Sequence, residues 1–338
     1  MKKFFCILLT LTLSIVPLAG CKAKAPLKEE ELYALDTIIT MSVYSDNTEA
    51  IDFAENEIKR LESLLSVTNS DSDVNKINDS AGSFVRVSDE CFELIKTAKE
   101  VSKATSGFFD VTVYPAVKLW GFTSSIYKVP TDSELLEVKS LIDYNKIEID
   151  ESTKSIRIPE GASLDLGGIA KGFIADKAAE ALQNQGVESA LLNFGGNIRL
   201  IGSKPQGESF KIGIKAPFKE GYFAILKAKD ITASTAGGYE RYFEENGKRY
   251  HHILNPFTAS PAESNVLSAT VIGKSGEVCD ALSTAAFVMG TEGIGDLTSK
   301  YEDYSFIILT EECVYVSKAI FDAFELTEGF KTLKISLI

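Results

Sequence analysis

Apolar positions along the chain follow two spacings, and each spacing predicts a different kind of element. Runs rich in β-branched or apolar residues predict strands at Thr37–Tyr44, Ser189–Phe194, Leu267–Ile272, Phe306–Leu309 and Val314–Val316. Spacings of three and four predict helices at Glu49–Leu65, from Ser88 to about Ala104, from the Thr131/Glu134 capping box, and at Gly168–Gln185 and Glu277–Met289. Asn246-Gly247 predicts a tight turn between hairpin strands Tyr239–Glu244 and Arg249–Leu254.

The order of these elements is mixed, without regular strand–helix–strand repetition. We therefore expect an α+β (mixed α/β) fold. No composition shift marks a linker after residue 32, so residues 32–338 are expected to form one compact domain, with room for two lobes.

The first residues have the pattern of an export signal. Lys2 and Lys3 precede the apolar run Phe4–Ala19, which is shorter than the roughly 20 residues of a membrane-spanning helix. The run ends in Leu18-Ala19-Gly20-Cys21, the lipobox pattern of bacterial lipoproteins. We expect residues 1–20 to be a lipoprotein signal peptide, Cys21 to carry the lipid, and residues 21–31 to be a tether. The protein would then sit on the extracytoplasmic face of the cell membrane; a plain secretory signal is the alternative.

Charge narrows the choice of ligands. The formal net charge is −13, and it becomes about −15 without residues 1–20. Such a chain repels nucleic-acid phosphates, so nucleic-acid binding is set aside. An anionic ligand would need a metal ion or backbone amides beside it, although the charge on its own is explained by solubility.

A Gly-rich segment, Asp165 to Gly172, is the first candidate for chemistry. It leads into the predicted helix at Gly168, and helix N-termini favour anions because their N–H groups point outward. Lys171 lies in the first turn, where the helix dipole disfavours a cation unless an anion is bound. The alternative is structural: Asp165 caps the helix and the glycines form a tight turn.

A second candidate is the oxygen cluster on the predicted helix Glu277–Met289. Asp280, Ser283 and Thr284 share one helical face, and carboxylate and hydroxyl oxygens are ligands that Mg²⁺ prefers. A solvated polar face is the alternative, but the neighbouring residues are mainly apolar.

Three further segments carry polar or aromatic groups that suit a site, and each also has a purely structural explanation. His251 and His252 are the only histidines, and in a strand they face opposite sides, so one at most is expected in a site as a general base. No Cys/His spacing suggests a zinc site or a disulfide framework. Aromatic residues surround Trp120, and a Ser/Gly turn precedes Arg241; core packing and simple turn formation explain these as well.

Together these segments resemble the ApbE family of FAD:protein FMN transferases, from about Leu35 to Leu326. The resemblance implies that FAD is contacted by Leu35, Thr68, Trp120, Gly121, Phe122, Asp165, Lys171 and Leu254. It implies that Mg²⁺ is bound by Asp280, Ser283, Thr284 and main-chain oxygen at Gly168 or Ala170. His252 matches the family histidine suggested as the base.

The chain departs from the family pattern at several positions. Leu35-Asp36-Thr37 stands where many members have Met-Gly-Thr, and Thr68 where many have a Tyr that stacks on FAD. Asn255 replaces a common Asp, and Thr258-Ala259 replaces Thr-Gly. The first two departures concern flavin packing and leave the metal and phosphate residues unchanged.

The function that the resemblance implies is Mg²⁺-dependent transfer of FMN from FAD to a Ser or Thr hydroxyl, with release of AMP. The acceptors would be redox proteins at the same membrane face. Two alternatives are an FAD pyrophosphatase that uses water as acceptor and a flavin-binding lipoprotein without turnover. A purely structural lipoprotein is disfavoured by the grouping of the five segments.

Overall fold

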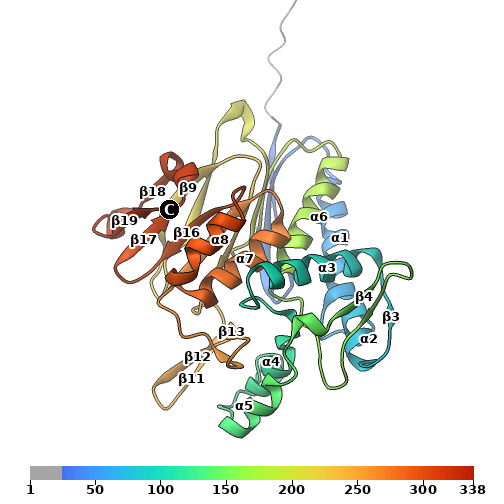
Figure 1. The fold of residues 1–338 in the computed structure, drawn as a ribbon. Helices are drawn as coiled ribbons and strands as arrows, with labels where there is room; N and C mark the ends of the chain where they lie inside the picture. The colour runs from blue at the N-terminus through green and yellow to red at the C-terminus, as the bar shows by residue number, and fades with distance from the viewer. Residues whose placement is uncertain (1–24) are drawn as a thin grey trace, which may run out of the picture.

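A nine-stranded sheet forms the centre of the molecule in the computed structural model, which describes residues 25–338 (Figure 1). The strand order is β1-β2-β6-β7-β10-β15-β16-β17-β19, antiparallel throughout except for the parallel pair β17 and β19. The strands are β1 (Leu27–Ala34), β2 (Thr37–Tyr44), β6 (Ser189–Phe194), β7 (Ile198–Gly202), β10 (Thr232–Ala236), β15 (Ser268–Gly273), β16 (Ser305–Leu309), β17 (Cys313–Val316) and β19 (Lys334–Leu337).

Helices cover one face of this sheet and a three-stranded sheet covers the other. In β16, Phe306 and Ile308 join the helix-side core, whereas Ile307 and Leu309 join the core beneath the small sheet. Successive residues of a strand point to opposite faces, so one apolar strand serves both cores. The helices are α1 (Ala50–Leu65), α2 (Asp73–Asp79), α3 (Asp89–Ala104), α4 (Tyr114–Trp120), α5 (Asp132–Lys139), α6 (Ala170–Asn184), α7 (Gly276–Met289) and α8 (Ile294–Lys300). The covering sheet comprises β8 (Phe210–Lys215), β9 (Tyr222–Ala228) and β18 (Phe324–Leu326).

A smaller apolar cluster lies apart from these two cores. It contains Trp120 and Phe122 and belongs to the end of the molecule that carries α4, α5 and the hairpin (Figure 1). This end corresponds to the second lobe for which the sequence left room, and it belongs to the same compact domain as the rest of the chain. The remaining strands are β3 (Val85–Arg86), β4 (Glu148–Asp150), β5 (Ser155–Arg157), β11 (Tyr242–Glu245), β12 (Lys248–His251), β13 (Leu254–Asn255) and β14 (Ser260–Pro261).

The structure confirms the mixed α/β fold and most predicted elements. The hairpin strands are shorter than predicted, and the turn residues Asn246 and Gly247 have φ of 52° and 76°. Helix α6 begins at Ala170 rather than Gly168. None of the helices within residues 25–338 has the length and apolar character needed to cross a membrane.

The predicted boundary between tether and domain is too late. Residues 27–31 belong to β1, which pairs with β2 along its whole length. Most side chains of β1 are exposed and several are acidic, as is common for an edge strand. Because of this polar pattern, the sequence predicts a tether here and no strand. The predicted signal peptide and Cys21 lie outside the described residues.

Helices α6 and α7 cross at a glycine pair. A Cβ on Gly172 would overlap the carbonyl oxygen of Gly276, and a Cβ on Gly276 would overlap that of Gly172. This contact allows two reciprocal caps: Asp280 Oδ2 of α7 accepts the Gly172 N–H of α6 at 3.0 Å, and Asp176 Oδ2 of α6 accepts the Gly276 N–H at 2.5 Å. Each helix therefore supplies an acceptor for a free N–H at the start of the other.

Replacing Gly172 by Ala is expected to lower the free energy of unfolding by about 1–3 kcal/mol or more, because the added methyl forces the two backbones apart. Gly295→Ala in α8 is the matched control, since no atom lies within 4 Å of a Cβ there and alanine favours a helix by about 1 kcal/mol. Urea denaturation of both variants measures the difference. Equal stability of Gly172→Ala and the unaltered protein would contradict the close crossing.

Candidate active site

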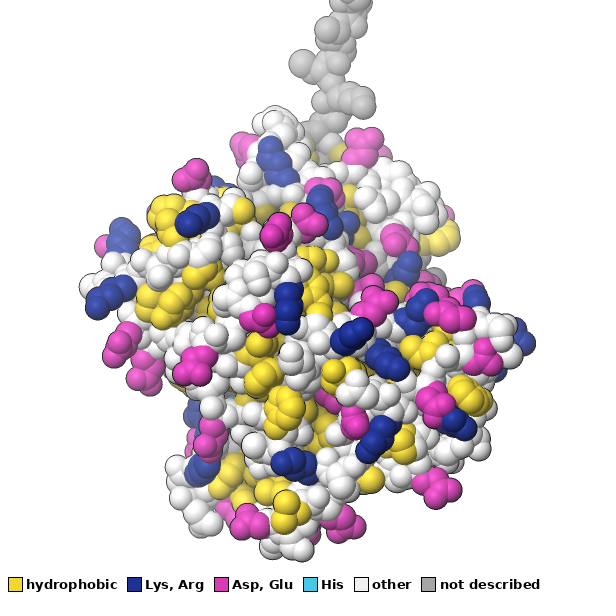
Figure 2. Space-filling view, in the orientation of Figure 1, with side chains coloured by type: hydrophobic (Ala, Val, Ile, Leu, Met, Phe, Trp, Pro, Cys, Tyr) yellow, Lys and Arg dark blue, Asp and Glu magenta, His cyan; other side chains and the backbone are white. Residues whose placement is uncertain are grey.

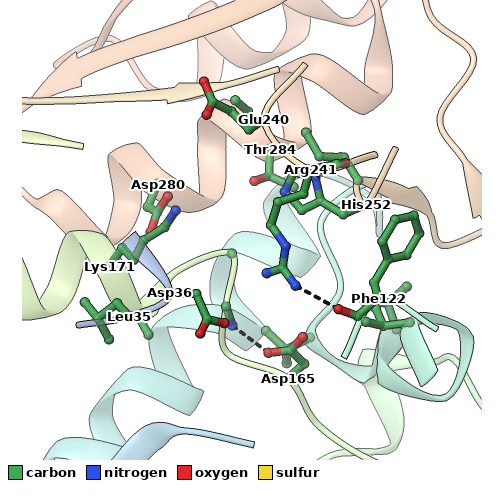
Figure 3. A pocket seen from close by; sticks show the side chains of 18 of the residues that line it. Leu35, Asp36, Phe122, Asp165, Lys171, Glu240, Arg241, His252, Asp280 and Thr284 are labelled. Carbon is green, nitrogen blue, oxygen red and sulfur yellow. Dashed lines mark hydrogen bonds between the residues drawn. The ribbon is translucent and has the colours of Figure 1, made fainter. Parts of the chain in front are cut away.

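A cavity of about 410 Å³ opens where the start of α6, one face of α7, the β1–β2 turn and the hairpin end meet. Its volume lies within the range of roughly 300–1,000 Å³ that is usual for small-molecule sites. Figure 3 shows side chains from these separate segments pointing into one space. The cavity brings together these predicted residues: Leu35, Thr68, Phe122, Asp165, Gly168, Ala170, Lys171, His252, Leu254, Asp280, Ser283 and Thr284.

Trp120 and Gly121 do not line the cavity but support its wall. The Trp120 indole is 3% exposed, donates from Nε1 to the Ala259 carbonyl oxygen at 2.8 Å, and packs against Tyr250. Gly121 ends α4 with φ 83°, and a Cβ there would overlap the Ile126 carbonyl. These two residues therefore fix the position of Phe122, which does face the cavity.

Asp165 closes the turn that precedes α6. Its Oδ1 accepts the Gly167 N–H at 2.8 Å, and its own N–H donates to the Val111 carbonyl. Burial raises the pKa of this carboxyl, while the Gly167 hydrogen bond and the Arg241 charge lower it. The carboxylate thus shapes the turn and does not cap α6 itself.

The cap of α6 comes from Asp280. This side chain is 6% exposed, and the Gly172 N–H, the Lys171 N–H and the Lys171 charge all favour its anionic form. Burial is the larger influence and raises the pKa of Asp280. A cation next to this carboxylate would offset the cost of its burial.

Oxygen atoms suited to a hard cation surround Asp280. The Thr284 hydroxyl makes no hydrogen bond to another described residue, and a Cβ on Gly168 would lie 3.7 Å from its Oγ1. Because the Gly172 N–H turns to Asp280, it does not bond to the Gly168 carbonyl, which stays available. A carboxylate, a hydroxyl and a carbonyl on one wall fit Mg²⁺.

Ser283 and Ala170 fit this oxygen set less well. The Ser283 hydroxyl donates to the Asp280 carbonyl at 2.8 Å, which leaves only its lone pairs. Ala170 is the first residue of α6, where the carbonyl belongs to the helical hydrogen-bond ladder. Within residues 25–338 no group of three or more His, Cys, Asp or Glu side chains forms a metal site. The fit therefore depends on hydroxyl and main-chain oxygen.

The two histidines face different surroundings, as predicted. His251 Nε2 lies 3.1 Å from the Ala262 carbonyl and its ring packs edge-on against Phe287. His252 faces the cavity, and its Nδ1 lies 3.1 Å from the Arg241 carbonyl, which also accepts the His252 N–H. A carbonyl only accepts, so Nδ1 carries the proton and Nε2 keeps a lone pair.

Burial, then the charges of Arg241 and Lys171, lower the pKa of His252 to about 3. The imidazole is therefore neutral at physiological pH and able to accept a proton. An anion bound beside the two cations would raise this pKa and strengthen the base.

Two departures from the family pattern fall at left-handed backbone positions. Asp36 has φ 56° and Ala259 has φ 54°, where glycine is favoured. Leu35 also has a positive φ, and its N–H donates to Glu62 Oε1 at 2.6 Å. Glu62 thereby holds the β1–β2 turn against the cavity.

The polar lining residues that the sequence does not predict include Glu62, Asn197 and Arg241. Glu62 lies on the polar side of α1, where nothing in the pattern distinguishes it from other acids. Asn197 follows Gly195-Gly196 and is buried, and its side chain acts on Asp280, whose pKa it lowers. The Ser/Gly segment predicts a turn before Arg241, but the sequence does not indicate where the side chain of a lone arginine beside a hairpin points.

Comparisons with known proteins agree over most of the chain. The ApbE family model matches residues 35–308. The FAD:protein FMN transferase of Klebsiella pneumoniae (strain 342) is 35% identical over 277 residues, covering 81% of this chain and 86% of the relative. That of Treponema pallidum (strain Nichols) is 32% identical over 298 residues, covering 81% and 82%.

Solved structures show the same likeness. The ApbE protein of Thermotoga maritima matches with a TM-score of 0.80 and 33% identity, covering 91% of this chain and 99% of that one. The apo flavinyl transferase ApbE of Pseudomonas stutzeri matches with a TM-score of 0.79 and 28% identity, covering 89% and 98%.

We predict that His252 stays neutral at pH values well below its ordinary pKa of 6.5, to about pH 5 or lower. NMR titration of the imidazole signals can follow this directly, because the chain has only two histidines. Lys171→Gln removes a nearby positive charge and should raise the pKa of His252. Lys177→Gln should not, because this partly exposed lysine of the same helix is paired with Glu180. A pKa near 6.5 in the unaltered protein would refute the electrostatic description of the cavity.

Proposed function

We propose that this chain, which belongs to the ApbE family, transfers FMN from FAD to a Ser or Thr hydroxyl of acceptor proteins and releases AMP. Family membership makes it an enzyme of flavin transfer, since its curated relatives are FAD:protein FMN transferases. One observation supports the finer proposal: the free Nε2 of His252 opens on the same cavity as Lys171 and the oxygen atoms around Asp280. Base, cation and metal ligands thus share one space.

The pyrophosphate of FAD is proposed to lie at the start of α6. Lys171 and the helix N-terminus present positive charge there, which an acidic chain needs for an anionic ligand. Leu35, Phe122 and Leu254 give the cavity apolar walls for a flat ring. Thr68 lies in the lining as well and offers a hydroxyl in place of a stacking aromatic ring.

Mg²⁺ would be held by the Asp280 carboxylate, the Thr284 hydroxyl and the Gly168 carbonyl oxygen. When bound, it supplies charge neutralisation for the pyrophosphate and for the departing AMP. The protein keeps these ligands in place through the α6–α7 caps, because Asp280 is fixed by the Gly172 N–H. Ser283 supports the same face from within the helix.

The proton transfer falls to His252. Its Nε2 takes the proton from the acceptor hydroxyl while that oxygen attacks the FMN-side phosphorus. The bond from this phosphorus to the bridging oxygen breaks, and its electron pair leaves with AMP. The product is FMN joined to the acceptor through a phosphoester.

Location and acceptors are proposed from the N-terminal signal. A lipid on Cys21 would hold the enzyme at the extracytoplasmic face of the cell membrane, with residues 22–26 between the anchor and β1. The acceptors would then be redox proteins exposed at that face.

Incubating the protein with FAD, Mg²⁺ and an acceptor protein should give covalent flavin fluorescence in a denaturing gel. Asp280→Ala should abolish labelling, because it removes the metal ligand and leaves the Gly172 N–H without its acceptor. Asp296→Ala, an exposed carboxylate of α8 paired with Lys300, should label normally. Chelation by EDTA should stop labelling and added Mg²⁺ should restore it.

The same assay separates the alternatives. Release of FMN and AMP at equal rates with and without acceptor, and no covalent product, would identify an FAD pyrophosphatase. Tight retention of intact FAD without turnover would identify a flavin-binding protein. Either result would overturn the transferase proposal.

His252→Gln should lower the transfer rate by about 10²–10⁴, the usual contribution of general acid–base catalysis. Binding of FAD should change little, because His252 is neutral and contributes no charge. Rapid-mixing measurement of the transfer step and fluorescence titration of FAD give the two numbers. An unchanged transfer rate would exclude His252 as the base.

A further inference from the structure

Arg241 points into the cavity without an acidic partner. Its Nη2 donates to the Phe122 carbonyl oxygen at 2.8 Å, and the guanidinium makes no other hydrogen bond or ion pair with residues 25–338 (Figure 3). A guanidinium has five N–H donors, so four remain for a ligand. By contrast, four other arginines each lie within 4.0 Å of a carboxylate: Arg60, Arg157, Arg199 and Arg249.

What sets this cation apart is its position: it lines the cavity of a chain whose formal net charge is −13. On the face shown in Figure 2, acidic and basic side chains are interspersed over the surface. Arg241 has the Asp165 carboxylate nearby, but the two form no ion pair, because Asp165 is turned to the Gly167 N–H. The guanidinium and Lys171 both act on His252, so two cations and the proposed base face the same space. Such a cavity favours an anion with several oxygen atoms.

The main chain of Arg241 sets its place in the reaction. Its carbonyl oxygen accepts both the N–H and the Nδ1–H of His252. The residue that carries the guanidinium therefore also holds the imidazole in place through its main chain. Lys171 lies instead beside Asp280, at the start of α6. The base must contact the attacking hydroxyl, and the attacked phosphorus is bonded to that oxygen in the product. A cation adjacent to the base is therefore placed at the transferred phosphate.

We infer that Arg241 is a further catalytic residue that binds the phosphate oxygens of the transferred FMN, while the Lys171 side of the cavity holds the phosphate of AMP. This assignment rests on the proposed function. As the acceptor oxygen bonds to phosphorus and the bridging bond breaks, negative charge on the non-bridging oxygens of the FMN phosphate is held by the Arg241 N–H groups. The hydroxyl proton goes to His252 Nε2, and the electron pair of the broken bond leaves with AMP.

A structural role for Arg241 predicts something different. If the guanidinium only holds the Phe122 carbonyl, and so the wall beside the flavin, its loss should weaken every ligand that carries the flavin ring. If it binds phosphate, its loss should weaken FMN and leave riboflavin unaffected, because riboflavin has the ring and no phosphate. Affinities for FMN, riboflavin and AMP therefore separate the two roles without turnover.

The experiment titrates the full-length protein with FMN, riboflavin and AMP in the presence of Mg²⁺. For Arg241→Gln we expect FMN affinity to fall at least about 10-fold, with riboflavin and AMP each changed less than about 2-fold. Arg241→Lys keeps the positive charge, so its FMN affinity should lie between those of Arg241→Gln and the unaltered protein. Arg249→Gln is the matched control: this arginine lies on the same hairpin but pairs with Glu244, so all three affinities should be unchanged.

Kinetics supply a second readout. Arg241→Gln should lower kcat of FMN transfer by about 10²–10³ with a smaller change in KM for FAD, the pattern of a group that acts mainly in the transition state. Arg241→Lys should recover part of kcat.

Three results would overturn the assignment: an equal loss of FMN and riboflavin affinity, a loss of AMP affinity in place of FMN affinity, or no preference of the unaltered protein for FMN over riboflavin. Failure of the transferase proposal itself would look different. The unaltered protein would then give no covalent product, while the FMN-to-riboflavin comparison would still report on Arg241.

Discussion

The reciprocal capping of α6 and α7 is the constraint on which the site depends. Each helix begins with free N–H groups inside the protein, and each is capped by a carboxylate of the other: Asp280 for Gly172 and Asp176 for Gly276. Buried N–H groups without acceptors are costly, so the two helices stabilise each other only in this crossing. The glycine pair permits the approach, because a methyl group at either position would overlap the opposite backbone.

The same crossing places the proposed anion site and the proposed cation site side by side. Asp280 takes the Gly172 N–H that would otherwise bond to the Gly168 carbonyl, so one hydrogen bond both caps α6 and releases a main-chain oxygen. Asp176 is tied in addition to Arg199 and Thr232, which anchors the pair to β7 and β10 of the central sheet. The proposed metal ligands therefore stand on helices that are tied to the central sheet.

The sequence predicted what local pattern and helix geometry determine. β2 and β6 were predicted residue by residue, and Asp280 and Thr284 were placed on one helical face before any tertiary contact was known. Contacts between segments far apart in the sequence could not be predicted. Nothing near Gly172 in the sequence shows that its N–H is capped from 108 residues away, and the polar edge strand β1 resembled a tether. Arg241 and Asn197 were missed because the direction of a side chain at a turn depends on the packing of other segments.

The second wall of the cavity is built on different principles. The hairpin β11–β12 is a sheet of two strands, so each strand has one unpaired edge, and an isolated two-stranded hairpin is marginally stable. It is held by the aromatic stack of Phe243 and Tyr250 on Trp120, and by the Arg241 bond to Phe122. Since His252 follows this hairpin, the proposed base and Arg241 belong to a wall held by the aromatic cluster, whereas the proposed AMP side is held by α6 and α7. In the proposed reaction the leaving group is therefore held by the two crossed helices, while the attacking hydroxyl of the acceptor protein approaches beside the hairpin.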